Sequence, residues 1–97
     1  MKVEFIEPAL IELDDAIEYY NLQSIGLGEI FFEEVLTNIR LISKFPGAWQ
    51  KYTEHTYKTT LRKFPYNLIF YRETNFIYIL AVAHHHRKPE YWIERYK

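Results

Sequence analysis

The spacing of the apolar residues changes once along the chain, and this change limits the folds that the chain can adopt. From Pro8 to Lys44 the apolar residues recur at intervals of three and four, the period of an amphipathic helix. Beyond the segment 44–47, Lys-Phe-Pro-Gly, they alternate with polar residues or form unbroken runs, as in strands. Proline and glycine do not continue a helix, so this segment marks the boundary. The sequence therefore predicts a helical part followed by a sheet part.

Two helices are predicted before this boundary. A stripe of apolar residues with acids on the opposite face predicts the first helix over residues 8–22, with Pro8 in its first turn, where a missing N–H does no harm. A second apolar stripe predicts a helix from Leu27 to Ile42. Gly26 in the short link between them can take a left-handed turn. So short a link predicts an antiparallel helical hairpin.

The predicted strands lie on both sides of the hairpin. A short alternating strand over residues 2–7 precedes the helices, and three strands follow them, at residues 57–64, 66–72 and 76–84. Pro65 falls at a strand junction, since proline cannot donate a ladder hydrogen bond. Residues 89–97 can form a last helical turn. The predicted fold is α+β, in the order β-α-α-β-β-β with a short C-terminal helical tail. The hairpin packs on a small, mostly antiparallel sheet, and residues 1–97 form a single domain.

Composition excludes several classes of protein. The chain has no cysteine, so disulfides and thiolate metal sites are excluded. It lacks both an apolar run of the roughly 20 residues that span a bilayer and the layout of a signal peptide. We therefore expect a cytoplasmic protein without membrane contact. Residues 1–50 carry three bases against nine acids, a balance of −6, and residues 51–97 carry nine against four, a balance of +5. This asymmetry indicates an acidic partner such as nucleic acid or an acidic protein, or two halves that attract each other, or chance.

Three consecutive histidines, His84 to His86, end the last predicted strand. Neighbours in a strand point to opposite faces, so His84 and His86 share a side and His85 points away. Three ligands for zinc therefore do not converge from this run, and we expect no metal and no cofactor. A solvated strand end, proton transfer near neutral pH and contact with a partner remain open as roles for the histidines.

A second group of candidate residues is basic. Lys58 and Arg62 recur at period two in their strand, and Arg87 and Lys88 follow the last strand. Together with His85 they would form a basic sheet face that attracts phosphate or carboxylate groups. An ordinary solvated sheet face is the alternative.

The chain also carries two aromatic residues near its C-terminus. Tyr91 and Trp92 could stack on a base, or pin the tail to the sheet.

Three segments resemble the RelE/ParE family of bacterial toxins, particularly its plasmid stabilisation branch. They are residues 8–49, residues 61–72 with Phe-Pro-Tyr before an apolar strand, and residues 79–92 with the ending Ala-Val-Ala-His-His-His-Arg-Lys-Pro-Glu-Tyr-Trp. The resemblance covers nearly the whole chain. It implies a helical hairpin on a small antiparallel sheet, and one half of a toxin–antitoxin pair whose antitoxin is normally encoded beside it and lays a segment over the toxin. RelE-like members cut messenger RNA in the ribosome, whereas ParE-like members act on DNA gyrase and are not known to need catalytic residues.

The resemblance also carries over the residues of a RelE-like nuclease, position by position. Lys58 matches one basic position and Tyr91 matches the C-terminal tyrosine. Thr60 and Asn67 stand where bases are expected, and His85 approaches an arginine position, with Arg87 two residues on. Neither threonine nor asparagine supplies the positive charge that stabilises a phosphoryl transition state.

A nuclease remains conceivable with a different set of residues. His84 or His85 would take the proton of the 2′-hydroxyl group, while Arg62 and Arg87 would hold the phosphate and Tyr91 would orient it. The candidate catalytic residues on this hypothesis are His85, Arg87, Tyr91 and Arg62.

The leading hypothesis is a ParE-like toxin that inhibits DNA gyrase by protein contact and is neutralised by an antitoxin in a hetero-oligomer. The alternative is a metal-independent messenger RNA endonuclease that acts at the ribosome, and a small binding domain without toxicity is the third possibility. The candidate contact residues are Lys58, Arg62, His84, Arg87, Lys88 and Trp92.

Overall fold

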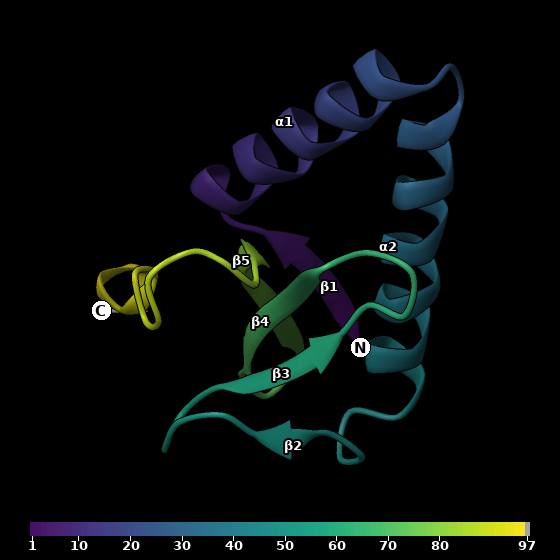
Figure 1. Cartoon of the computed structure of the whole chain (residues 1–97). Helices are drawn as coiled ribbons and strands as arrows, with labels where there is room; N and C mark the ends of the chain where they lie inside the picture. Colours follow the sequence, from purple (N-terminus) through teal and green to yellow (C-terminus); the bar gives the residue numbers. More distant parts are fainter. Residues whose placement is uncertain (97) are drawn as a thin grey trace.

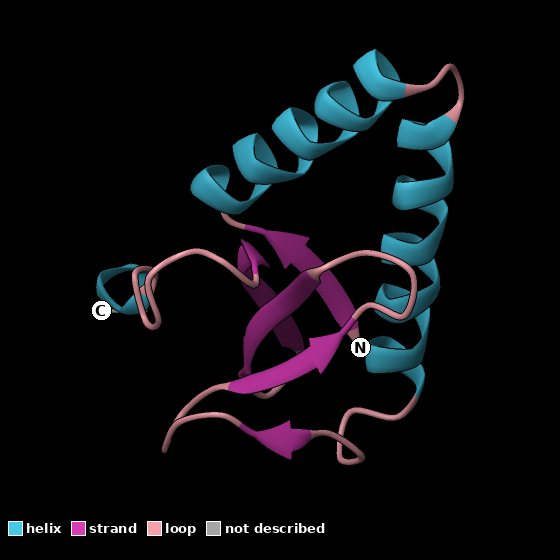
Figure 2. Cartoon of the chain, viewed as in Figure 1, coloured by secondary structure: helices cyan, strands magenta, loops and turns pink. Residues whose placement is uncertain are grey.

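The computed structural model describes residues 1–96. Its elements are β1 (Lys2–Phe5), α1 (Glu7–Gln23), α2 (Leu27–Lys44), β2 (Gln50–Lys51), β3 (Tyr57–Thr60), β4 (Tyr66–Arg72), β5 (Phe76–His84) and the 3₁₀ turn η1 (Ile93–Arg95). The five strands form one sheet in the order β1-β5-β4-β3-β2. Figures 1 and 2 show α1 and α2 meeting at a turn and diverging over the sheet. The predicted α+β fold with a helical hairpin is confirmed.

The two edges of the sheet carry features that the prediction of a mostly antiparallel sheet did not specify. β1 pairs with β5 in parallel, with Phe5 opposite Ile79, whereas every other pairing is antiparallel. Along the sequence, the whole helical hairpin separates β1 from the other strands. A connection of this length can bring the chain back to the sheet in the same direction, so a parallel pair can form. The edge strand β2 was not predicted, because two exposed residues carry no hydrophobic period.

The turn of the hairpin depends on two glycines. Gly26 has φ 87°, the left-handed conformation that its position predicted. Gly28 serves a different purpose, since a Cβ atom there would run into the backbone oxygen of Ile17 and the side chain of Asn21. The Gly28 N–H also donates to Asn21 Oδ1 at 2.8 Å. The absence of a side chain at Gly28 therefore lets α1 and α2 approach closely.

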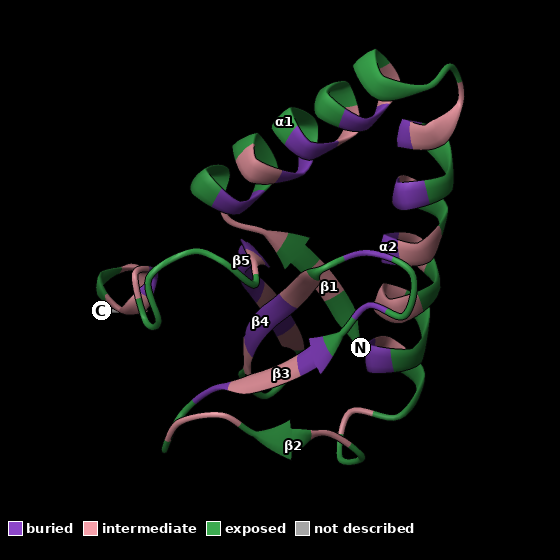
Figure 3. Cartoon of the chain, viewed as in Figure 1, coloured by how far each residue is buried: buried purple, intermediate pink, exposed green. Residues whose placement is uncertain are grey.

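The main core lies between the helices and one face of the sheet. Its largest buried members include Phe31 and Val35 from α2, Leu68 and Phe70 from β4, and Ile79 from β5. In Figure 3 the buried colour follows the sides of α1 and α2 that face inward, and their outer sides are exposed. The apolar stripes predicted for both helices therefore form the core.

A second, smaller core lies under the C-terminal tail. Ile69, Leu80, Ala81 and Ala83 pack against Trp92, of which only 1 % is exposed. A β-bulge makes this possible: Ile69 pairs with Ala81 and Phe70 pairs with Ile79, so Leu80 has no partner in the ladder. The tail thus covers part of the sheet face for which a basic binding surface and an ordinary solvated surface had both been considered.

Neither α1 nor α2, the two long helices of residues 1–96, has the length and hydrophobicity that a membrane span requires.

Candidate functional site

The histidine run closes β5 as its alternation predicted. The His84 and His86 rings contact each other at 4.9 Å between centroids, and Tyr66 meets His84 edge-on at 5.0 Å. The backbone N–H of His86 donates to His84 Nδ1 at 3.0 Å. The side chain of His85 is exposed, and its backbone N–H donates to the Pro65 oxygen at 2.8 Å. The first and third histidines thus form one pair, and the second lies apart from it.

The pair of histidines favours a neutral His84. Burial lowers the pKa of His84 below its ordinary value of 6.5, and the neighbouring His86 and His85 add to this effect. Because Nδ1 accepts a hydrogen bond from a backbone N–H, the single proton of the neutral ring lies on Nε2. No group of three or more His, Cys, Asp or Glu residues within residues 1–96 is arranged to hold a metal ion.

A buried carboxylate, Glu12 of α1, organises the C-terminal tail. Arg95 forms a fork with it, with Nη1 at 2.9 Å from Oε1 and Nη2 at 3.0 Å from Oε2. The Tyr91 hydroxyl donates to Oε2 at 2.6 Å, and the backbone N–H of Val82 donates to Oε1 at 3.0 Å. Arg87 Nη1 lies 4.0 Å from Oε2. The side chain of Glu12 is only 14 % exposed, so this charge is matched on every side, as a buried charge requires.

The same network fixes Tyr91. The guanidinium carbons of Arg87 and Arg95 lie 3.9 Å and 5.0 Å from the centre of its ring. Burial raises the pKa of the Tyr91 hydroxyl, and the hydrogen bond to Glu12 raises it further. Tyr91 is therefore a protonated donor whose partner is a carboxylate. In this arrangement the Tyr91 hydroxyl is bound to Glu12 and does not point to an open site.

The predicted basic sheet face loses Arg62. The ladder of β3 ends at Thr60, so Arg62 leaves the period-two row. The backbone N–H groups of Arg62 and Lys63 both donate to the Glu34 carboxylate, and this holds the segment against α2. Lys58 stays on the sheet face under the tail, with its ammonium group 4.4 Å from the centre of the Tyr52 ring. The expectation that Arg62 shares a surface with Lys58, His85 and Arg87 was wrong, because it assumed that the strand continues.

Two other predicted positions are engaged within the fold. The Thr60 hydroxyl donates to Asn67 Oδ1 at 2.7 Å, so the residues that replace two expected bases pair with each other. Trp92 is buried against the sheet, with Tyr52 at 5.7 Å between ring centroids. This matches the alternative in which Trp92 pins the tail and cannot stack on a base. Lys88 is exposed and lines a small cavity of about 80 Å³. The same cavity is lined by His84, His85, Arg87, Tyr91 and Trp92, so the structure brings these predicted residues together.

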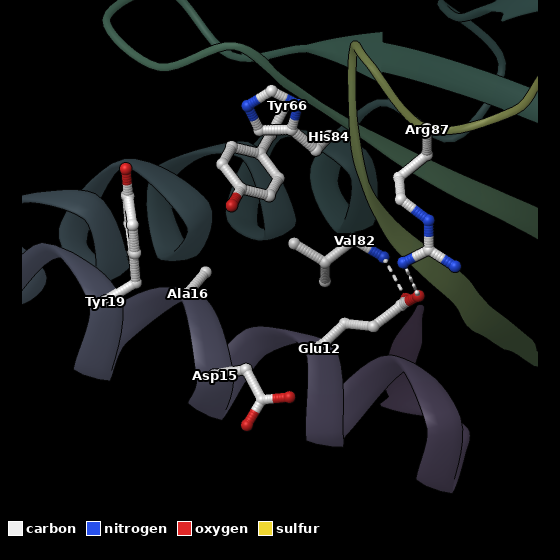
Figure 4. A pocket seen from close by; sticks show the side chains of 8 residues that line it. All are labelled: Glu12, Asp15, Ala16, Tyr19, Tyr66, Val82, His84 and Arg87. Carbon is white, nitrogen blue, oxygen red and sulfur yellow. Dashed lines mark hydrogen bonds and ion pairs between the residues drawn. The ribbon is translucent and has the colours of Figure 1, made fainter.

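Another pocket lies between α1 and the end of β5 (Figure 4). It has a volume of about 350 Å³. One wall comes from α1, and the other comes from β4, β5 and the loop that follows them. The lining residues are Glu12, Asp15, Ala16, Tyr19, Tyr66, Val82, His84 and Arg87. We call this pocket the α1 groove. It brings together His84 and Arg87 from the predicted set, but not Arg62.

Sequence reasoning did not identify Glu12, Tyr66 and Arg95 as members of the site. Glu12 was one of several acids on the polar face of its helix, and its bonds to Arg95 span 83 positions in the chain. Nothing in the local pattern distinguishes Glu12 from the other acids. The pairing follows only from the fold, which brings the tail back across α1.

The fold and the site define a small α+β domain, with a helical hairpin over one sheet face and a tail over the other. A solved structure described as the chromosomal ParDE TA system from P. aeruginosa has this fold, with a TM-score of 0.74, 16 % identity, and coverage of 87 % of this chain and 95 % of that chain. A search of curated protein sequences gives no match. Residues 3–89 match the family of ParE toxins of type II toxin–antitoxin systems, parDE. The chain belongs to this family.

Proposed function

We propose that this chain is a toxin that inhibits DNA gyrase in the cytoplasm by protein contact, and that a cognate antitoxin neutralises it. Membership of the ParE toxin family supports the toxin role. The choice of gyrase over messenger RNA rests on the arrangement of the nuclease candidates.

The observation that carries this choice is the engagement of Tyr91. Its hydroxyl donates to Glu12 at 2.6 Å, and its ring lies against two guanidinium groups. A nuclease would need this hydroxyl, or a group like it, directed at the phosphate. Positioning within a few tenths of an ångström and preorganised charge are the main sources of catalysis in phosphoryl transfer. In this chain the hydroxyl instead helps to hold the tail.

The distribution of the bases supports the same choice. Arg62 lies beside α2, with its backbone held by Glu34, and Arg87 lies 4.0 Å from the Glu12 carboxylate. Lys58 contacts the Tyr52 ring. These three cations therefore face different partners and do not converge on one phosphate. Inhibition through surface contact requires no such convergence.

The test of the target is pulse-labelling after tightly induced expression in a bacterium, with DNA and protein synthesis followed separately. We expect DNA synthesis to fall first, and we expect the purified protein to inhibit supercoiling by purified gyrase. An earlier fall in protein synthesis would favour the messenger RNA endonuclease. A culture in which neither falls would favour a binding domain without toxicity.

The exposed apolar side chains of the helical hairpin support the proposal that an antitoxin binds and neutralises the chain. Large apolar side chains remain exposed on the hairpin, among them Leu10, Ile11, Leu22 and Ile25, and burying them against a protein partner would remove apolar surface from water. We expect co-expression of the antitoxin to restore growth and to yield a stable complex. A truncation series of the antitoxin that left its affinity unchanged would contradict this contact.

A further inference from the structure

We propose that the α1 groove receives an arginine side chain from a basic, partly apolar segment of the antitoxin. This inference rests on the proposed function for the identity of the partner. It adds the surface, the chemistry of the segment and the residue that enters the groove.

The outer face of α1 combines apolar and acidic residues. Ile11, Tyr19 and Leu22 are 53 %, 55 % and 81 % exposed. Their spacing places them on the same side of the helix as Asp15 and Glu18. Burying these apolar side chains in a complex removes apolar surface from water, which favours association. This helix face therefore fits an amphipathic partner segment.

The negative charge of α1 determines which charge the partner segment should carry. Helix α1 contains five acids and no base in its sequence Glu-Pro-Ala-Leu-Ile-Glu-Leu-Asp-Asp-Ala-Ile-Glu-Tyr-Tyr-Asn-Leu-Gln. Glu12 is matched by Arg95 and Arg87. Within the described part of the chain no hydrogen bond or ion pair engages the side chains of Asp14, Asp15 or Glu18. A partner that lies along α1 meets uncompensated negative charge, so a basic segment is complementary to it.

The α1 groove lies beside this outer face of α1, between the helix and the end of β5. Figure 4 shows Tyr19 rising from α1 toward the wall that carries Tyr66 and His84, while the exposed side chain of Asp15, which also lines the groove, points away from that wall at the rim. The cation already present, Arg87, faces the Glu12 carboxylate. His84 is neutral near pH 7, because its pKa lies below 6.5. Among the charged residues that line the groove, Asp15 is thus the one without an ion-pair partner. Its negative charge favours the binding of a cation beside it.

An arginine fits the groove better than a lysine does. A guanidinium group is planar, stacks on aromatic rings and pairs with a carboxylate through two N–H groups. The groove offers the rings of Tyr19 and Tyr66 and the carboxylate of Asp15. Its volume of about 350 Å³ is ample for one such side chain and water. The His84 Nε2–H remains available to donate to a carbonyl group of the incoming backbone.

The experiment measures the affinity of the antitoxin encoded beside this chain for three toxins by titration calorimetry. These are the native chain, Asp15→Asn, and Asp14→Asn as the matched control, since Asp14 is an acid of the same helix that does not line the groove. A charge-assisted hydrogen bond buried in the complex is lost only in Asp15→Asn, so we expect a weakening of roughly ten- to a hundredfold. The control should change the affinity less than about threefold.

A second variant identifies the partner residue. Asp15→Arg should abolish binding, and replacing one arginine of the antitoxin with glutamate should restore it. Equal effects of Asp15→Asn and Asp14→Asn, or the lack of any restoring position, would overturn the proposal. Gyrase inhibition by Asp15→Asn without antitoxin is measured in parallel. If Asp15→Asn weakens gyrase inhibition but not antitoxin binding, the groove serves the target and the proposal is wrong. If the native chain leaves gyrase unaffected, the proposed target is wrong while the affinities still decide the role of the groove.

Discussion

At the residue scale, the tyrosine that looks catalytic helps to hold the tail of the chain. Tyr91 occupies the position that the resemblance assigns to a nuclease tyrosine, yet its hydroxyl is bound by Glu12. The two roles make opposite predictions for the same substitution. A structural tyrosine is needed for stability, and a catalytic tyrosine is needed for activity.

Tyr91→Phe should destabilise the fold and leave the growth arrest intact. The hydroxyl makes a hydrogen bond to a buried carboxylate, and such a bond contributes roughly 1.5–3 kcal/mol. Urea unfolding measures this loss, and induced expression measures the toxicity. The control is Tyr78→Phe, because the Tyr78 hydroxyl makes no hydrogen bond within residues 1–96. Loss of toxicity in a Tyr91→Phe protein of near-native stability would support the endonuclease instead.

His84 should make the stability fall in mild acid. Its pKa in the folded chain lies below the ordinary value of 6.5, so the unfolded chain binds this proton more readily. The contribution is fully present above about pH 6.5 and is lost as the pH falls toward the folded pKa. We expect His84→Gln to reduce the difference in thermal midpoint between about pH 7.5 and about pH 5. His85→Gln, a change in an exposed side chain, is the control, and an equal effect there would contradict the assignment to His84.

At the scale of elements, the sequence predicted what depends on local pattern. The hydrophobic period located α1 over residues 8–22, and the structure places it at Glu7–Gln23. The same reasoning failed for Arg62, because a period-two row continues only as far as the strand does. Pairing with β4 stops at Thr60, and Glu34 of α2 then binds the backbone of the next segment. That competing partner lies 28 positions away and has no local signature.

Gly28 gives a prediction for the helical hairpin. Gly28→Ala places a Cβ atom against the Ile17 backbone oxygen and the Asn21 side chain, so the helices must separate. Overpacking of this kind destabilises a fold by roughly 1–3 kcal/mol. Gly47→Ala is the matched control, since a Cβ atom there has no neighbour within 4 Å. Chemical denaturation of both variants checks this, and equal stabilities would show that the close approach at Gly28 is unimportant.

At the scale of the whole molecule, the sheet is covered on both faces, and this could not be predicted from the strands alone. The sequence left open whether Tyr91 and Trp92 meet a partner or pin the tail. The choice depends on Glu12 and Arg95, which join α1 to the tail across 83 positions. The β-bulge at Leu80 adds an apolar residue to the second face. Both features are long-range, so a local pattern could raise the alternative but not decide it.

Trp92→Ala tests whether the tail is part of the fold. The side chain is 1 % exposed and is the largest member of the second core. Truncating a buried tryptophan removes roughly 3–5 kcal/mol, which is a large share of the 5–15 kcal/mol that stabilises a typical domain. We expect Trp92→Ala to unfold at much lower urea concentration, and Trp92→Phe to recover most of the loss. A single cooperative transition in each variant would show that both cores unfold together. A native-like midpoint for Trp92→Ala would mean that the tail does not stabilise the rest of the fold. The sheet face beneath the tail could then become accessible to a partner.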